Sequence, residues 1–179
     1  MIVSIPVDRL LVRPHFLWNH QWLLLTSGDF RSGHFNTMTV AWGSLGTMWH
    51  RPFVQVVVRP SRHTYTFMEK YDTFTLCAFP EAFREALQLL GSVSGRDEDK
   101  IARSGLHAAA CPGVEAPGFE EAELMIGARK IYRYDLEPEQ FLDSDIESNY
   151  PGGDYHRVYF GEILSVQGVS CFDADSVSS

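Results

Sequence analysis

Apolar and β-branched runs, separated by turn residues, make up most of the first half of the chain. Phe53 to Val58 is almost entirely apolar and has the length of a buried strand. Before it, turn signals such as Ser27-Gly28-Asp29 divide shorter runs with strand composition. We expect strands at residues 22–26, 30–35, 37–45, 53–58 and 73–79, with residues 46–52 as a connection.

Three segments have the apolar spacing of helices. Residues 62–70 carry Tyr65 and Met68 at helical intervals. Residues 81–90 follow Pro80, begin with acidic residues and place Leu87 and Leu90 on one face, as an amphipathic helix does. A third, short helix is expected at residues 97–104.

The second half is expected to contain two long strands, at residues 121–136 and 156–169, on either side of an acidic, irregular segment at 137–150. Many strands joined by turns, with only a few helices between them, indicate an antiparallel barrel rather than alternating βαβ units. The polar residues 173–179 are expected to form a flexible tail. This leaves one domain, at residues 1–172.

Composition and charge narrow the classes of partner. A chain of 179 residues with 45% hydrophobic content can form one domain with a real core. Its net charge of -8 argues against nucleic acid or an anionic membrane as a partner. The three cysteines form no C-x-x-C pair, and the N-terminus has neither a basic lead nor a long apolar run. We therefore expect a cytoplasmic protein without a disulfide framework.

Known site motifs for metals and nucleotides are missing from the sequence. The histidines show neither H-x-x-x-H nor paired-carboxylate spacing, so no metal site is expected. G-x-G-x-x-G and G-x-x-x-x-G-K-[ST] are also absent, which argues against Rossmann and P-loop nucleotide sites.

A cluster of anion-binding side chains follows the buried strand. Pro60 ends that strand, and Ser61 is placed to cap a helix that begins near Arg62. A helix N-terminus offers unpaired N–H groups and a positive dipole end, so two arginines (Arg59 and Arg62) and two hydroxyls (Ser61 and Thr64) around it suit a phosphate. The alternative is that Ser61 is only a cap and that the arginines pair with surface acids.

Five segments carry a resemblance to a known family. They are W-L-L-L-T-S-G (22–28), N-T-M-T-V-A-W (36–42), R-P-S-R-H-T-Y (59–65), S-G-R-D-E-D-K (94–100) and A-R-K-I-Y (128–132). Together and in this order they resemble the flavin reductase-like, FMN-binding split-barrel family, and its flavoredoxin-type members most closely. The resemblance implies an all-β split barrel of Greek-key type with inserted helices, and a homodimer that binds FMN at or near the subunit interface.

The resemblance also implies which residues meet the cofactor. The segment from Asn36 to Trp42 would line the flavin, the Arg59–Thr64 group would bind its phosphate, and Lys100 would add a charge from a second loop. Trp42 is equally well explained as a core or interface aromatic. The residues expected at the cofactor are Asn36, Thr37, Met38, Thr39, Val40, Ala41, Trp42, Arg59, Ser61, Arg62, Thr64, Ser94, Gly95 and Lys100.

Two positions depart from the family pattern. Asp154-Tyr155-His156 stands where many family reductases carry Gly-Asp-His, so His156 is only a weak catalytic candidate, and no other catalytic residue is assigned. Ala128 stands where flavoredoxin-like relatives frequently have cysteine, so no redox thiol is expected there.

The expected function follows from the implied cofactor. FMN would be reduced by transiently bound NADH or NADPH, or by a partner, and would pass electrons to free flavin, a redox protein or another small acceptor. Hydride transfer to flavin needs no side-chain acid or base, because the cofactor carries the chemistry. The alternative is a non-catalytic flavin-binding or electron-carrier module that does not oxidise NAD(P)H.

Overall fold

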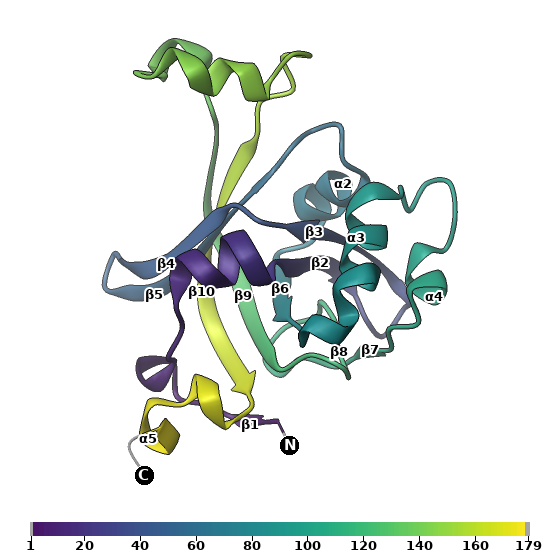
Figure 1. Cartoon of the computed structure of the whole chain (residues 1–179), viewed down its shortest axis with the longest axis vertical. Coiled ribbons are helices and arrows are strands. Elements are labelled where there is room, and N and C mark those ends of the chain that lie inside the picture. The colour runs from purple at the N-terminus through teal and green to yellow at the C-terminus, as the bar shows by residue number, and fades with distance from the viewer. Residues whose placement is uncertain (1, 178–179) are drawn as a thin grey trace.

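One antiparallel sheet of eight strands forms the centre of the molecule in the computed structural model, which describes residues 2–177 (Figure 1). The strands run in the order β3-β2-β6-β9-β10-β5-β4, and β1 pairs with β10. They are β1 (Val3–Ser4), β2 (Leu23–Asp29), β3 (His34–Val40), β4 (Gly43–Met48), β5 (Arg51–Val58), β6 (Thr73–Ala78), β9 (Leu124–Asp135) and β10 (Arg157–Gly168). Short strands β7 (Ala108–Ala109) and β8 (Gly118–Phe119) pair separately. The expected all-β split barrel with inserted helices is confirmed.

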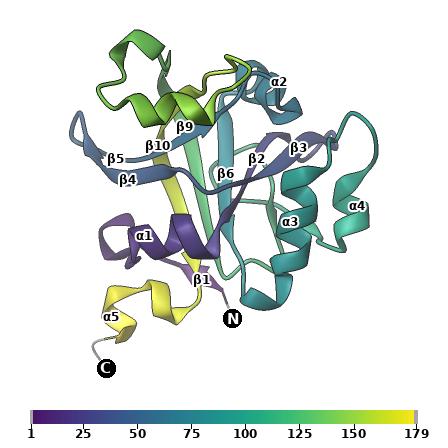
Figure 2. The ribbon, with the colours of Figure 1, turned by 45° about the horizontal axis from the view of Figure 1, so that its top comes forward.

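The helices lie around this sheet (Figure 2). They are α1 (Pro14–Phe16), continued by a π-helical turn at Leu17–Gln21, and α2 (His63–Lys70), α3 (Arg84–Ser92), α4 (Lys100–Ser104) and α5 (Ala174–Val177). Short 3-10 turns occur at Val7–Arg9, Glu81–Phe83, Pro138–Gln140, Ser144–Asn149 and Ser170–Phe172. No helix in residues 2–177 is long and apolar enough to span a membrane.

Alternating side chains on the strands build two apolar layers. Leu25 and Leu76 point into the barrel interior, which Leu17 and Trp18 also fill. Their neighbours Leu24 and Cys77 point outward and pack in a second layer with residues of α3 and α4. The sheet is therefore buried on both faces in this part of the molecule, and β3 lies at its edge, beside α3.

The structure corrects the predicted boundaries around β3. Residues 30–33 form a turn, β3 pairs with β2, and the chain then breaks at residues 41–42, where it leaves β2 and joins β5 as β4. The predicted strands at 30–35 and 37–45, and the connection at 46–52, are thus wrong in position. The β4–β5 turn has positive φ at Trp49 (53°) and His50 (58°). Such hairpin turns usually carry Asn-Gly or Asp-Gly, and this turn lacks that sequence signal.

The other predicted elements agree with the structure to within a few residues. Helix α4 begins at Lys100, three residues later than predicted, because Asp99 accepts a hydrogen bond from the N–H of Ala102 and so caps the helix there. The chain from Asp173 was expected to be a flexible tail. In the structure Asp173 is buried and bonded to Arg9, and α5 follows, whereas residues 178–179 lie outside the described part.

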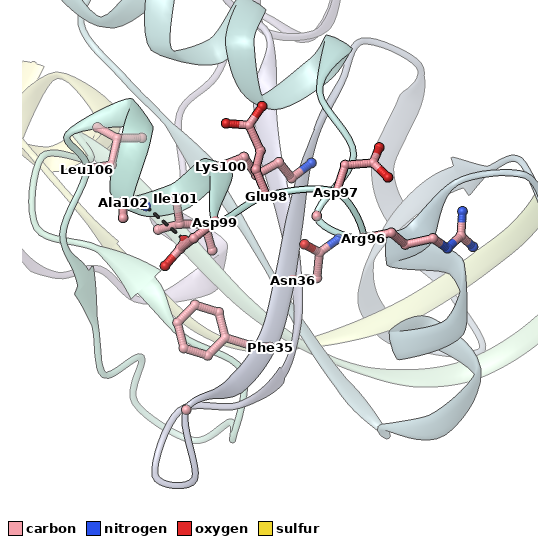
Figure 3. A pocket seen from close by; sticks show the side chains of 12 residues that line it. Phe35, Asn36, Arg96, Asp97, Glu98, Asp99, Lys100, Ile101, Ala102 and Leu106 are labelled. Atoms are coloured by element: carbon pink, nitrogen blue, oxygen red, sulfur yellow. Dashed lines mark hydrogen bonds between the residues drawn. The ribbon is translucent and has the colours of Figure 1, made fainter.

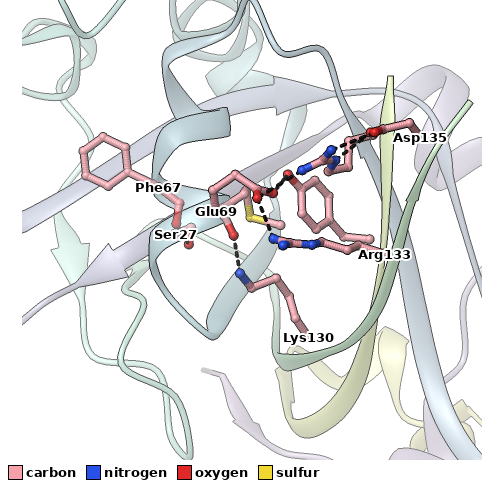
Figure 4. Close-up of polar contacts among 9 residues, drawn as sticks. Ser27, Phe67, Glu69, Lys130, Arg133 and Asp135 are labelled. Carbon is pink, nitrogen blue, oxygen red and sulfur yellow. Dashed lines mark hydrogen bonds and ion pairs between the residues drawn. The ribbon is translucent and has the colours of Figure 1, made fainter. Parts of the chain in front are cut away.

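A polar network fastens α2 to the long β9–β10 hairpin, whose tip projects from the barrel (Figures 1 and 4). The Glu69 carboxylate accepts a 2.6 Å hydrogen bond from the buried Tyr159 hydroxyl and pairs with Arg157 (3.1 Å) and Arg133. Burial raises the pKa of Glu69, but these partners outweigh it and hold the pKa below its usual value. The C-terminal end of α2 is thus fixed, which sets the position of its N-terminal end.

Candidate functional site

Two cavities lie next to each other along β3. The strand cavity, of about 200 Å³, is lined by Met38, Thr39, Val40, Ala41, Trp42, Val57, Arg59 and His156. The cationic cavity, of about 130 Å³, is lined by Asn36, Met38, Ser61, Arg62, His63, Thr64, Ser92, Val93, Ser94, Arg96 and Lys100. Met38 belongs to both, so the two cavities follow one another along the strand.

Most of the predicted site residues line one of these cavities, with two exceptions. Thr37 lines neither, because its side chain is fully buried and its hydroxyl donates to the Leu25 carbonyl (3.0 Å) and accepts from Thr26 (2.9 Å). Gly95 lies just outside the cationic cavity, where a Cβ atom would come within 2.3 Å of Asn36 Oδ1. Gly95 therefore permits a close approach of its loop to β3.

Two cations from different elements meet in the cationic cavity at the C-terminal end of α3. Lys100 is only 3% exposed, and its Nζ donates to the carbonyls of Leu90 (2.9 Å) and Val93 (3.0 Å). The Arg62 guanidinium donates to the Gly91 carbonyl. These carbonyls are the negative end of the helix and have no further helical partner, so they hold both cations in place.

The pKa of the lysine in this cavity lies only a little above neutral pH. Burial, followed by repulsion from Arg62, lowers the pKa of Lys100 to about 8. Burial and repulsion from Arg59 also lower the pKa of Arg62. Most Lys100 side chains are still protonated at pH 7. An anion that binds between the two side chains would relieve their repulsion.

The N-terminal end of α2 forms another wall of the cationic cavity. The N-cap is Arg62 rather than the predicted Ser61, and its side chain does not bond to the first-turn N–H groups. The Thr64 hydroxyl accepts a 2.8 Å hydrogen bond from Asn36 Nδ2, which links the helix to β3. Among the described residues, the buried His63 Nδ1 is without a hydrogen-bond partner. The site therefore has a buried polar atom in need of a partner beside two cations.

Arg59 and Ser61, both expected at the phosphate, are bonded to a carboxylate of the chain itself. Arg59 donates to Asp154 Oδ1 (2.7 Å) and Ser61 donates to Asp154 Oδ2 (2.9 Å). Arg59 also donates to the Asn149 carbonyl (2.8 Å) and lies 4.9 Å from the centre of the Tyr150 ring. Arg59 lines the strand cavity and does not line the cationic one.

His156 and Trp42 form one end of the strand cavity. The His156 ring is 5.2 Å from the Trp42 ring, and its Nδ1 lies 2.8 Å from the Tyr150 hydroxyl. His156 is 8% exposed, and burial together with the charge of Arg59 lowers its pKa to about 4, so it is neutral at pH 7. Trp42 is 48% exposed and belongs to the cavity rim rather than to the core.

Sequence reasoning missed Asp154, Arg96 and His63 as members of the site. Arg96 lines the cationic cavity and donates to the Ser61 carbonyl (3.3 Å). It lies inside the S-G-R-D-E-D-K segment, so its charge was a usable signal. Asp154 gave no such signal, because nothing in the sequence indicates that the hairpin tip folds back onto Arg59.

Comparisons with solved structures agree with this fold. An FMN-binding domain of a flavin reductases-like enzyme from Shewanella baltica OS155 is 18% identical, with a TM-score of 0.68 over 94% of this chain and 77% of that chain. Flavoredoxin of Desulfovibrio vulgaris (Miyazaki F) is 24% identical (TM-score 0.63, 87% and 70%). The Streptomyces globisporus C-1027 NADH:FAD oxidoreductase SgcE6 is 14% identical (TM-score 0.61, 82% and 74%).

Sequence comparison gives the family. An uncharacterized protein of Escherichia coli (strain K12), YddH, is 35% identical over 99 residues, which is 55% of this chain and 52% of that protein. The chain thus matches about half the length of this curated relative. The family model of the flavin reductase like domain matches residues 19–175, which is most of the chain. The chain therefore belongs to the flavin reductase-like family.

Proposed function

We propose that the chain binds FMN along β3, with the phosphate in the cationic cavity and the ring system in the strand cavity. The observation that carries this proposal is the convergence of Arg62 and Lys100 beside the unpartnered His63 Nδ1. A phosphate monoester carries a charge of about -1.5 to -2 at pH 7 and offers three strong acceptor oxygens. Its oxygens would accept hydrogen bonds from both cations, and from His63 Nδ1 in the tautomer that carries the proton on this nitrogen.

The residues that line the two cavities would then contact different parts of FMN. Arg62 and Lys100 would hold the phosphate, with Ser94, Thr64 and Arg96 as further polar neighbours. Main-chain groups of residues 39–42 would meet the polar edge of the ring, and Val57 would supply an apolar wall. Thr39 would act through its backbone, because its hydroxyl donates to the Leu87 carbonyl.

The activity we propose is that of an NAD(P)H-dependent oxidoreductase. The family and the likeness to an NADH:FAD oxidoreductase support this class. FMN, when bound, would supply the two-electron chemistry, and the protein would bind it, orient it and exclude water. His156 is neutral at pH 7 and is therefore not a general acid there, so its part would be to shape the cavity together with Trp42.

Anaerobic titration of the flavin-loaded protein would test the activity. NADH or NADPH is added, and the flavin absorption band at about 450 nm is followed. Rapid bleaching by either nucleotide is the expected result. Bleaching by dithionite or a reduced protein, but by neither nucleotide, would contradict the reductase and favour the electron-carrier alternative.

An exposed aromatic surface supports the proposal of a homodimer. Trp49 is 55% exposed and Tyr132 is 50% exposed, and their rings lie 5.9 Å apart. Both rings also contact that of Phe160, on the adjacent strand β10. Clustered exposed aromatic side chains are typical of protein interfaces. Trp49→Glu combined with Tyr132→Glu should give a monomer by light scattering, whereas an unchanged mass would place the contact elsewhere.

A further inference from the structure

Tyr150, in the connection between β9 and β10, holds the His156 ring from one side. Tyr150 is 5% exposed, its hydroxyl lies 2.8 Å from His156 Nδ1, and the two rings meet edge to face at 5.5 Å. Arg59 fixes the tyrosine in turn, because it donates to the Asn149 carbonyl and lies over the Tyr150 ring. The tip of the hairpin therefore sets the orientation of His156.

The two ways of placing the protons in this hydrogen bond are not equivalent. If the Tyr150 hydroxyl donates, its hydrogen is bonded and neutral His156 carries its proton on Nε2. If His156 Nδ1–H donates instead, the hydroxyl hydrogen is left without an acceptor among residues 2–177, and an unpaired donor on a buried side chain is costly. Burial raises the pKa of Tyr150, so the phenol keeps its proton. The arrangement with Tyr150 as donor is therefore favoured.

The Nε2 edge of His156 opens to the strand cavity. In the described part of the chain Nε2 has no hydrogen-bond partner, yet it is not one of the enclosed side-chain atoms that lack a partner, which are Trp18 Nε1 and His63 Nδ1. His156 lines the strand cavity and is 8% exposed, so its remaining exposure lies there. The Nε2–H is thus a hydrogen-bond donor available to a molecule in that cavity.

A larger cavity beside α4 differs from the two cavities along β3 (Figure 3). It has a volume of about 570 Å³, no histidine lines it, and its Asp99 carboxylate accepts from the N–H of Ala102 (3.0 Å). The strand cavity and the cationic cavity each have a histidine nitrogen without a partner, on His156 and His63. A flavin that lies along β3, as proposed, would meet both, His63 near its phosphate and His156 near its ring.

We infer that Tyr150 is a positioning residue that holds His156 with its Nε2–H toward the polar edge of the flavin ring. This inference rests on the proposed function, because that function places the ring in the strand cavity. Reduction by hydride transfer leaves a negative charge at the pyrimidine edge of the ring, where a hydrogen-bond donor is then bonded more strongly. His156 would thus favour reduced over oxidised FMN, and Tyr150 would maintain this preference without contacting the flavin.

Nitrogen NMR of the flavin-free protein, labelled at its histidines, tests the tautomer at pH 7. Wild type should show His156 protonated on Nε2, and Tyr150→Phe should show a mixture of both tautomers. Tyr155→Phe is the matched control, because the Tyr155 ring lies 4.9 Å from that of Tyr150 but its hydroxyl donates to Glu147. A proton on Nδ1 in wild type, or the wild-type tautomer in Tyr150→Phe, would overturn the inference independently of any flavin.

Midpoint potentials of bound FMN test the effect on the ring. Tyr150→Phe should lower the affinity for reduced relative to oxidised FMN by about tenfold, which makes the potential of this two-electron couple about 30 mV more negative. Tyr155→Phe should leave the ratio of the two affinities unchanged. His156→Gln can place its amide nitrogen near the position of Nε2, so it should keep more of the ratio than His156→Asn, whose nitrogen replaces Nδ1.

The wild-type tautomer and the two His156 variants decide the inference even if Tyr150→Phe does not fold. The wild-type affinity ratio in both Tyr150→Phe and His156→Asn would overturn it and leave the proposed function standing. Failure of wild type to bind FMN would overturn the proposed function and the effect on the ring together, whereas the NMR result would still decide the tautomer.

Discussion

The two cavities along β3 differ in the net charge of their lining residues. In the strand cavity Asp154 pairs with Arg59, and His156 is neutral, so the walls carry little net charge. In the cationic cavity the bonding partners of Arg62 and Lys100 are helix carbonyls, so two positive charges stay together. Only three positions separate Arg59 from Arg62 in sequence. The comparison teaches that an arginine can bind an external anion only where no carboxylate of the chain is already paired with it.

The largest expected effect is a loss of stability at low pH, which comes from His156 in the strand cavity. His156 has a folded-state pKa of about 4, against an ordinary value near 6.5. Above pH 6.5 both folded and unfolded forms are neutral and stability is complete. As the pH falls from about 6.5 to 4, the unfolded chain takes up a proton that the folded chain does not, so the free energy of unfolding falls by up to about 3 kcal/mol.

Denaturant titrations at pH 7 and pH 4.5 would measure this loss. His156→Asn keeps a polar atom near the Tyr150 hydroxyl but does not titrate, so its stability should depend less on pH than that of wild type. A variant that loses as much stability as wild type would show that His156 is not held neutral.

The next effect compares the two arginines directly. Arg62→Gln should weaken FMN binding by about ten- to a hundredfold, because one charge-assisted contact contributes about 1.5–3 kcal/mol. Arg59→Gln should change it by less than about threefold, since Arg59 is already bonded to Asp154. Arg103→Gln, which removes an exposed arginine paired with Glu98, is the control. Similar losses for Arg59→Gln and Arg62→Gln in a fluorescence titration would remove the distinction between the cavities.

A smaller effect should appear in the pH dependence of binding. Lys100 has a pKa of about 8 without ligand, and a bound phosphate would raise it. FMN affinity should therefore fall by about tenfold between pH 7 and pH 9, as the lysine loses its proton while the phosphate keeps its full charge. Lys100→Met should bind FMN more weakly and without this decline. Unchanged wild-type affinity across the same range would exclude the lysine as a phosphate partner.

The smallest effect is expected at the internal carboxylate. Asp154→Asn removes the charge that holds Arg59 and Ser61, but both lie outside the proposed main phosphate contacts of Arg62 and Lys100. FMN affinity should change by less than about threefold, with a shift of the bound flavin spectrum because Arg59 and His156 share the ring cavity wall. A tenfold gain in affinity would instead mean that Asp154 competes with the phosphate.

Much of the fold could be predicted from the sequence, because apolar periodicity marks long elements well. Helix α2 and strands β6, β9 and β10 fall within a few residues of their predicted positions. The segment around β3 could not be divided correctly, since strand composition does not tell where a chain changes its pairing partner from β2 to β5. The hairpin at Trp49 and His50 has no glycine to mark it.

The site could be predicted as a set of residues but not as two separate environments. Arg62, Lys100 and Ser94 come together as expected, because local charge and the family pattern both indicated an anion site. The pairing of Arg59 with Asp154 joins positions 95 residues apart in sequence, and no local pattern contains that contact. The alternation along β3 was a usable signal for Thr37, whose side chain lies on the opposite face from Asn36 and Met38.

Comparison of FMN with riboflavin, which lacks only the phosphate, tests the central claim most directly. If the cationic cavity holds the phosphate, wild type should bind FMN about a hundredfold more tightly than riboflavin at pH 7, and Arg62→Gln should remove most of that difference. Riboflavin bound as tightly as FMN by the wild-type protein would contradict the account.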